Sequence, residues 1–225
     1  MMRRIAMIAL PLFLLSACSI MDISMQDTAV PLAPDKVEFS LYEALGVELS
    51  TMLDENTPEQ ELGGWFVSGV KFGIGLSPKA DLNGRLFYSG YTLGAKLGPK
   101  LLLSQTGKHY LSLLPALTFL KGSGDPDYPS YSSFGGEITL LSSWVPIPSL
   151  VPTLGARISY DNLTEGILQR DSYQHFGIFH GNLSGNLRLV AGAFFVAPEL
   201  GVEIVPLSGG VEFFPTGSLG IGLKF

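Results

Sequence analysis

The chain has 225 residues, of which 46% are hydrophobic and 15% charged, and its formal net charge is −6. Soluble domains usually carry about 25% charged residues, so this chain is unusually poor in charge. Its apolar content excludes an intrinsically disordered protein, and the negative charge without a basic run excludes a typical nucleic-acid binder. The length suits one domain, and the single cysteine, Cys18, excludes both an intramolecular disulfide and a cysteine-based metal cluster.

Residues 1–17 have the organisation of an export signal. Arg3 and Arg4 precede an apolar stretch over 5–15, which is too short to span a bilayer permanently. The stretch ends in Leu15-Ser16-Ala17-Cys18, which resembles the lipobox of bacterial lipoproteins. The resemblance implies cleavage before Cys18, transfer of a diacylglycerol to its thiol and acylation of the new amine. The alternative is an apolar helix that happens to contain a cysteine.

The residues after the lipobox predict a lipid-anchored linker. In enteric lipoproteins an Asp after the cysteine signals retention in the inner membrane, so Ser19 is compatible with the outer membrane. Residues 18–36 lack sustained periodicity and contain Pro31 and Pro34. We therefore expect a lipidated N-terminus followed by a periplasmic tether.

Residues 37–225 predict strands, because apolar residues alternate with small or polar ones and no apolar run is long enough for a transmembrane helix. The last strand is the clearest, since Leu219, Ile221, Leu223 and Phe225 occupy every second position. The ten predicted strands cover 38–50, 64–76, 81–88, 91–104, 109–121, 133–145, 151–161, 173–183, 188–204 and 211–225.

The polar faces of these strands carry charges of both signs. In a soluble barrel the large apolar residues point inward, whereas in a membrane barrel they face lipid and the small and charged residues line the lumen. A solvated outer face is the alternative interpretation of the charges. In a membrane barrel we expect a packed lumen of ion pairs and hydrogen bonds made by Lys71, Arg85, Lys96, Lys100, Arg157, Glu48, Asp81, Glu137, Glu199 and Glu203.

Connection lengths and aromatic placement favour the membrane barrel. The long predicted connections, 51–63, 122–132 and 162–172, all lie on one side, as the external loops of outer-membrane barrels do. The opposite side has the short connections 77–80, 105–108, 146–150 and 184–187. Aromatic residues gather near the loop side (Trp65, Tyr88, Tyr91, Phe134, Tyr160, Tyr173) and near the turn side (Tyr110, Trp144, Phe225).

The C-terminus adds a family resemblance. A final alternating strand through Leu219, Ile221 and Leu223 to a terminal Phe225 resembles the signature by which the assembly machinery recognises outer-membrane barrels. Residues 37–225 thus resemble a small bacterial outer-membrane β-barrel protein. The resemblance implies a closed, antiparallel, up-and-down all-β barrel of about ten strands, within a range of 8–12. It also implies contact with outer-membrane lipid and with the barrel-assembly and lipoprotein-processing machineries.

Five prolines, Pro99, Pro115, Pro152, Pro198 and Pro215, lie inside predicted strands, where each removes a ladder hydrogen bond. Pro99 is expected opposite residue 114 or 115. A shared kink or bulge in that hairpin would accommodate both prolines; otherwise the strand limits or the strand number must differ.

The sequence offers little for catalysis. His175 and His180 are five residues apart, so on one regular strand they face opposite sides and share neither a metal nor a dyad. We interpret these two and His109 as interface or turn residues, although a Ser–His pair across strands stays open. We expect no catalysis and no cofactor or metal, but a structural, small-solute passage or surface-contact role. The alternatives are a soluble lipocalin-like barrel that binds an apolar ligand and a barrel enzyme that acts on lipid.

Overall fold

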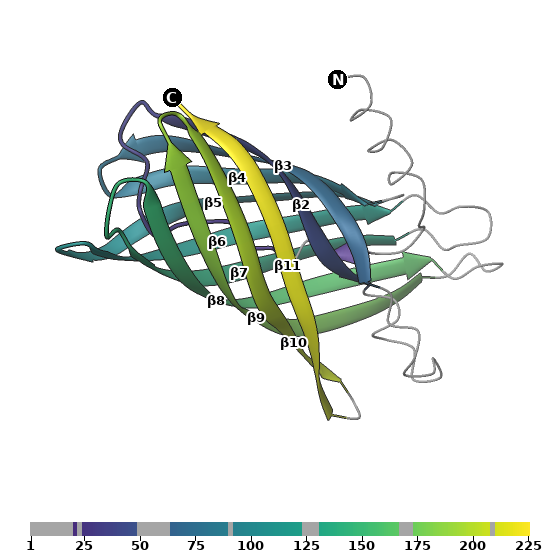
Figure 1. Ribbon diagram of the computed structural model, residues 1–225. Helices are drawn as coiled ribbons and strands as arrows, with labels where there is room; N and C mark the ends of the chain where they lie inside the picture. Colours follow the sequence, from purple (N-terminus) through teal and green to yellow (C-terminus); the bar gives the residue numbers. More distant parts are fainter. Residues whose placement is uncertain are drawn as a thin grey trace, which may run out of the picture.

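The computed structural model describes residues 20–21, 24–48, 64–89, 92–122, 131–166, 173–207 and 210–225. Ten antiparallel strands, each paired with its neighbour in sequence, close into a barrel because β11 also pairs with β2 (Figure 1). The predicted fold class is confirmed. The strands are β2 (Val37–Glu48), β3 (Gly64–Ser77), β4 (Ala80–Ser89), β5 (Thr92–Thr106), β6 (His109–Gly122), β7 (Tyr131–Trp144), β8 (Leu150–Gly166), β9 (Tyr173–Ala191), β10 (Phe194–Leu207) and β11 (Gly210–Lys224), with a two-residue β1 (Ile20–Met21) beside β2.

The two faces of the barrel wall reverse the usual arrangement of a soluble protein. Leu200 and Leu154 point outward with 76% and 70% of their surface exposed, whereas Lys71 and Glu203 point inward at 1% and 0%. Because side chains alternate along a strand, each strand contributes one apolar outer face and one polar inner face. This is the pattern of a barrel whose outer wall contacts lipid.

The two ends of the barrel differ. At one end, here named the turn end, short reversals join β3 to β4, β5 to β6, β7 to β8 and β9 to β10. The C-terminus also lies there, where Phe225 N donates to Val37 O at 2.9 Å. The opposite ends of the strands form the loop end, and the residues that connect them, 49–63, 90–91, 123–130, 167–172 and 208–209, lie outside the described part of the chain.

One predicted turn is wrong. Residues 184–187 lie inside β9, and the chain reverses at Gly192, whose φ of +64° lies in the left-handed region that suits glycine. The Ser-Gly-Asn composition suggested a turn, but the alternation continues through it, with Ser184 and Asn186 buried and Leu187 exposed. The predicted strand 188–204 is therefore divided between β9 and β10.

Pro99 and Pro115 lie opposite each other, as the sequence predicted, but the register is the same on both sides of them, so no bulge separates the two prolines. The register of β5 and β6 passes from Leu97 opposite Leu117 to Leu101 opposite Leu113, with Pro99 and Pro115 between these pairs. A further irregularity follows between Leu102 and Ser104. The two prolines thus share one break, and the barrel keeps its strand number.

The N-terminal segment does not form the tether predicted for residues 18–36. Residues 24–29 and Leu32 are buried inside the barrel, and the chain reaches the turn end just before β2 begins. We name residues 24–36 the plug. Residues 24–36 show no strand periodicity because their backbone groups bond to side chains of the barrel and form no ladder with a neighbouring strand.

Candidate functional site

The candidate site is the plugged lumen, and its centre is Asp27. The carboxylate accepts a hydrogen bond from Lys71 Nζ at 2.8 Å and from Arg85 NH2 at 3.3 Å, and Lys100 Nζ lies 3.8 Å away. Lys71, Arg85 and Lys100, here named the basic strip, stand on the adjacent strands β3, β4 and β5. All four side chains are buried, so the Asp27 carboxylate of the plug shares three cations from three strands with the wall carboxylates Glu38 and Asp81.

Barrel side chains also hold the backbone of the plug. Buried N–H and C=O groups need partners, and an irregular segment cannot supply them to itself. Glu199 accepts from two successive amides, Met25 N at 2.8 Å and Gln26 N at 2.5 Å. The other contacts with the barrel include Leu32 N to Asp81 (2.8 Å), Ala29 N to Ser143 (2.7 Å), Ser112 to Ala29 O (2.6 Å), Arg85 to Ser24 O (2.6 Å) and Asn186 to Asp27 O (2.6 Å).

Inward glycines make room for the plug. A Cβ atom on Gly75 would lie 1.9 Å from the carbonyl oxygen of Ala33, and one on Gly220 would lie 2.2 Å from the side chain of Gln26. A Cβ on Gly155 would come within 2.8 Å of Met25. Part of the high glycine content therefore corresponds to the path of the plug along the inner wall.

A second charged cluster lies on β7 to β10. His180 contacts Asp161 at 3.0 Å and also Glu203, and Arg157 donates to Glu203 at 2.9 Å. Beside it, Lys96 donates to Glu137 at 2.9 Å. Both nitrogens of the His180 ring contact carboxylates rather than a serine hydroxyl. These buried side chains therefore link strand β5 and strands β7 to β10 to one another on the lumen side of the wall.

The three histidines occupy different environments. His180 is buried in the lumen, so our interpretation of it as an interface or turn residue is wrong. His175 is exposed and contacts Thr164 at 3.0 Å, so the two residues do face opposite sides of β9. His109 stacks on Trp144 at the turn end. Among the described residues, no group of three or more His, Cys, Asp and Glu side chains is arranged to hold a metal ion.

The structure places nine of the ten predicted lumen charges inside the barrel, at 8% exposure or less; the side chain of the tenth, Glu48, lies outside the described part. Cys18 also lies outside it. The C-terminal residues Leu219, Ile221, Leu223 and Phe225 point outward, each at least 40% exposed.

Among the described residues, five further buried acidic or basic side chains of the lumen were not predicted: Asp27, Glu38, Asp161, His180 and Arg188. Glu38 is in phase with Ser40 and Tyr42, and Asp161 is in phase with Arg157, so alternation alone could have found both. Arg188, which donates to Glu38 at 2.6 and 3.0 Å, was lost with the misplaced turn. Asp27 gave no periodic signal.

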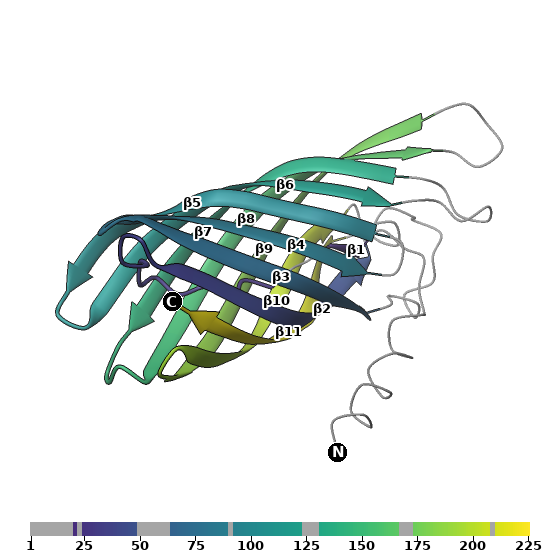
Figure 2. The same ribbon diagram turned by 90° about the horizontal axis from the view of Figure 1, so that it is seen from above.

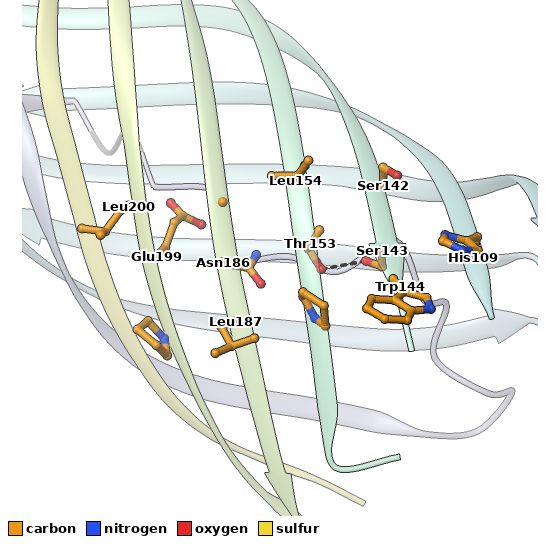
Figure 3. Close-up of a pocket in the computed structure, with 13 residues that line it drawn as sticks. His109, Ser142, Ser143, Trp144, Thr153, Leu154, Asn186, Leu187, Glu199 and Leu200 are labelled. Carbon is orange, nitrogen blue, oxygen red and sulfur yellow. Dashed lines mark hydrogen bonds between the residues drawn. The ribbon is translucent and has the colours of Figure 1, made fainter. Parts of the chain in front are cut away.

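The outer wall has apolar hollows. One of about 540 Å³ spans β7 to β10, where Pro152 and Pro198 stand and the exposed Leu154 and Leu200 form part of the lining (Figure 3). Ser143 and Thr153 form its polar floor and share a hydrogen bond of 2.7 Å. The exposed side chains of Leu154 and Leu200 place this hollow on the outer face of the wall.

Comparisons with known proteins give no family. No family model and no curated protein matches the chain. Among solved structures, the chain is similar to the N-terminal β-barrel domain of Pseudomonas aeruginosa OprF (15% identity, 86% of this chain and 100% of that chain, TM-score 0.38). It is also similar to Neisserial surface protein A (12%, 84% and 94%, 0.43) and to the outer membrane protease OmpT from Escherichia coli (10%, 88% and 99%, 0.46). We infer no activity from these similarities.

Proposed function

We propose that this protein is a bacterial outer-membrane barrel, lipid-anchored at Cys18, whose lumen is closed by its own N-terminal plug. The observation that carries the proposal is the plug itself, with Asp27 held by the basic strip and the backbone held by Glu199 and Asp81. A lumen filled in this way favours a structural or surface-contact role over steady passage of solutes.

The chemistry of the two wall faces supports insertion in a bilayer. Leucine, isoleucine and phenylalanine side chains cover the outside of every strand from β2 to β11, and many are more than 40% exposed. In water this surface would far exceed the apolar patch that a soluble monomer exposes. The expected export signal and the long connections at the loop end favour an orientation with the loop end outside the cell.

The two alternative functions fit the lumen less well. A lipocalin-like barrel needs an apolar cavity inside, but this lumen is charged and occupied, and the hollow across β7 to β10 opens outward. A lipid-modifying enzyme needs an activated nucleophile within reach of its base. His180 instead contacts Asp161 and Glu203, which orient it as part of a structural cluster.

The experiment that separates the membrane barrel from a soluble barrel removes the lipid but keeps export. Residues 1–18 are exchanged for a signal peptide that ordinary signal peptidase cleaves, so that the mature chain begins at Ser19 without acyl chains. Outer membranes are then washed with alkaline carbonate. We expect the barrel to stay in the membrane pellet, with the wild-type chain as control. Release of the unlipidated chain would contradict the proposal and favour a soluble barrel held only by its lipid.

A further inference from the structure

The contacts of the plug run in one direction through the barrel. In β1, Ile20 and Met21 pair with Glu48 and Val47, the last residues of β2 at the loop end. At the other limit of the plug, Gly75 N donates to Lys36 O at 2.9 Å beside the turn between β3 and β4. The chain therefore enters the lumen at the loop end and leaves it at the turn end, where β2 begins.

The intermediate contacts follow the same order. Ser24 accepts from Arg85, Asp27 lies in the basic strip, and Leu32 N donates to Asp81. Arg85 stands in the middle of β4, whereas Asp81 stands near its turn-end start. Successive plug residues thus contact wall residues progressively closer to the turn end.

β1 lies at the seam between the first and last barrel strands. Among the described residues, β11 pairs with β2 over Ser218–Lys224 only, whereas its residues Gly210–Gly217 pair with β10 and not with β2. Beyond Ala44, toward the loop end of β2, β1 pairs with Val47 and Glu48 on the edge that β11 occupies farther down the strand. Figure 2 shows β1 beside the end of β2, away from the C-terminus. β1 therefore occupies the loop-end part of the seam.

Cys18 is only two residues before Ile20, so its Cα lies within about 7 Å of that residue. Exposed apolar side chains flank the seam on both strands, Leu45 on β2 and Val211 and Phe213 on β11. Acyl chains on Cys18 would find an apolar wall there. If residues 19–36 ran outside the lumen, their length alone would also let Cys18 reach the turn end. The contacts of the plug inside the lumen instead place Cys18 near the loop end.

We propose that the mature N-terminus emerges at the loop end through the β2–β11 seam, so that its lipid lies in the leaflet at that end. With the orientation above, this is the outer leaflet, and the anchor faces the cell surface rather than the periplasm. The inference rests on the proposed lipidated membrane barrel.

The experiment adds one thiol, either two residues before the plug as Asp22→Cys or at the last plug residue as Lys36→Cys. Cells are labelled with a maleimide that does not cross the outer membrane. We expect Asp22→Cys to react on intact cells and Lys36→Cys to react only after the outer membrane is permeabilised. The wild-type chain, whose Cys18 sulfur would be blocked by lipid, serves as the background. Tags at residues 126 and 106 mark the loop end and the turn end independently.

An epitope inserted between Asp22 and Ile23 gives a second measurement in case the thiol is occluded. Antibody binding on intact cells supports the inference. Binding only after permeabilisation, or reaction of Lys36→Cys but not Asp22→Cys on intact cells, overturns it. Fatty-acid labelling of the wild type and its loss in Cys18→Ser test the lipid anchor separately, so failure of lipidation is distinguishable from failure of the threading.

Discussion

Substitution of Asp27 by Asn tests whether the plug closes the lumen. The amide keeps the shape of the side chain but removes the carboxylate that lies 2.8 Å from Lys71 and 3.3 Å from Arg85. Both cations are buried, and breaking a buried pair by removing one partner costs about 3–5 kcal/mol. Glu38, 3.3 Å from Lys71, still offers a partial partner, so we expect the lower part of this range.

A loss of about 3 kcal/mol corresponds to a roughly 100-fold larger population of chains with the plug displaced. The barrel itself keeps its ladders, because Asp27 belongs to no strand. The wild type is expected to show low or no steady conductance in planar bilayers. Asp27→Asn is expected to show frequent openings, and the plug is expected to become sensitive to protease.

The matched control is Asp161→Asn, which removes an equally buried carboxylate whose partners Thr118 and His180 belong to the barrel. This variant is expected to lower stability without opening the lumen. Stable, large, porin-like channels from the wild type would refute the reasoning. So would equal conductance of Asp27→Asn and the wild type, or equal opening in both variants.

Two further predictions concern the wall. Lys96→Ala and Glu137→Ala should each lower the free energy of unfolding by about 3–5 kcal/mol, while the double variant should lose less than the sum, because both partners of the 2.9 Å pair are buried; strictly additive losses in urea titrations would contradict the pairing. Gly75→Val should leave the barrel assembled but displace the turn-end part of the plug, since its Cβ would lie 1.9 Å from a backbone oxygen; protease resistance of the plug equal to that of the wild type would contradict the close approach.

Alternation made the wall predictable, and its failures have physical causes. In β3, β5 and β8 the outward and inward residues follow the predicted phase, because a period of two is imposed by the strand itself. The reversal at Gly192 was missed because the preceding Ser184 to Leu187 have turn-like composition while still obeying the period. The turn-like composition of residues 184–187 was thus given more weight than their strand-like alternation, and Arg188 was assigned to the wrong strand.

The plug could not be predicted in the same way. Its residues have no common period, because the barrel side chains that they contact lie 44 to 192 positions away in the chain. The composition of residues 18–36 predicted a linker, because Pro31 and Pro34 lie near the end of this segment. The one available signal was indirect: the lumen residues Lys71, Arg85 and Lys100 gather on three adjacent strands, and the burial of such charges requires a counter-charge. Asp27 satisfies this requirement from outside the sheet.

The position of the plug at the seam also bears on how such a barrel could assemble. An acylated N-terminus drawn through a closed ring would carry its hydrocarbon chains past buried Lys71, Arg85 and Glu199, which an apolar chain could not solvate. The plug is continuous with β2 at the turn end, and β1 lies on the edge of β2 that faces β11 at the loop end. If β11 pairs with β2 last, the ring closes around a chain already lying along its inner wall. Among the described residues, the first and last strands pair only over Ser218–Lys224, so closure there leaves the loop-end part of the seam to β1. With the lipid anchor proposed at Cys18, the acyl chains would then not need to cross the lumen.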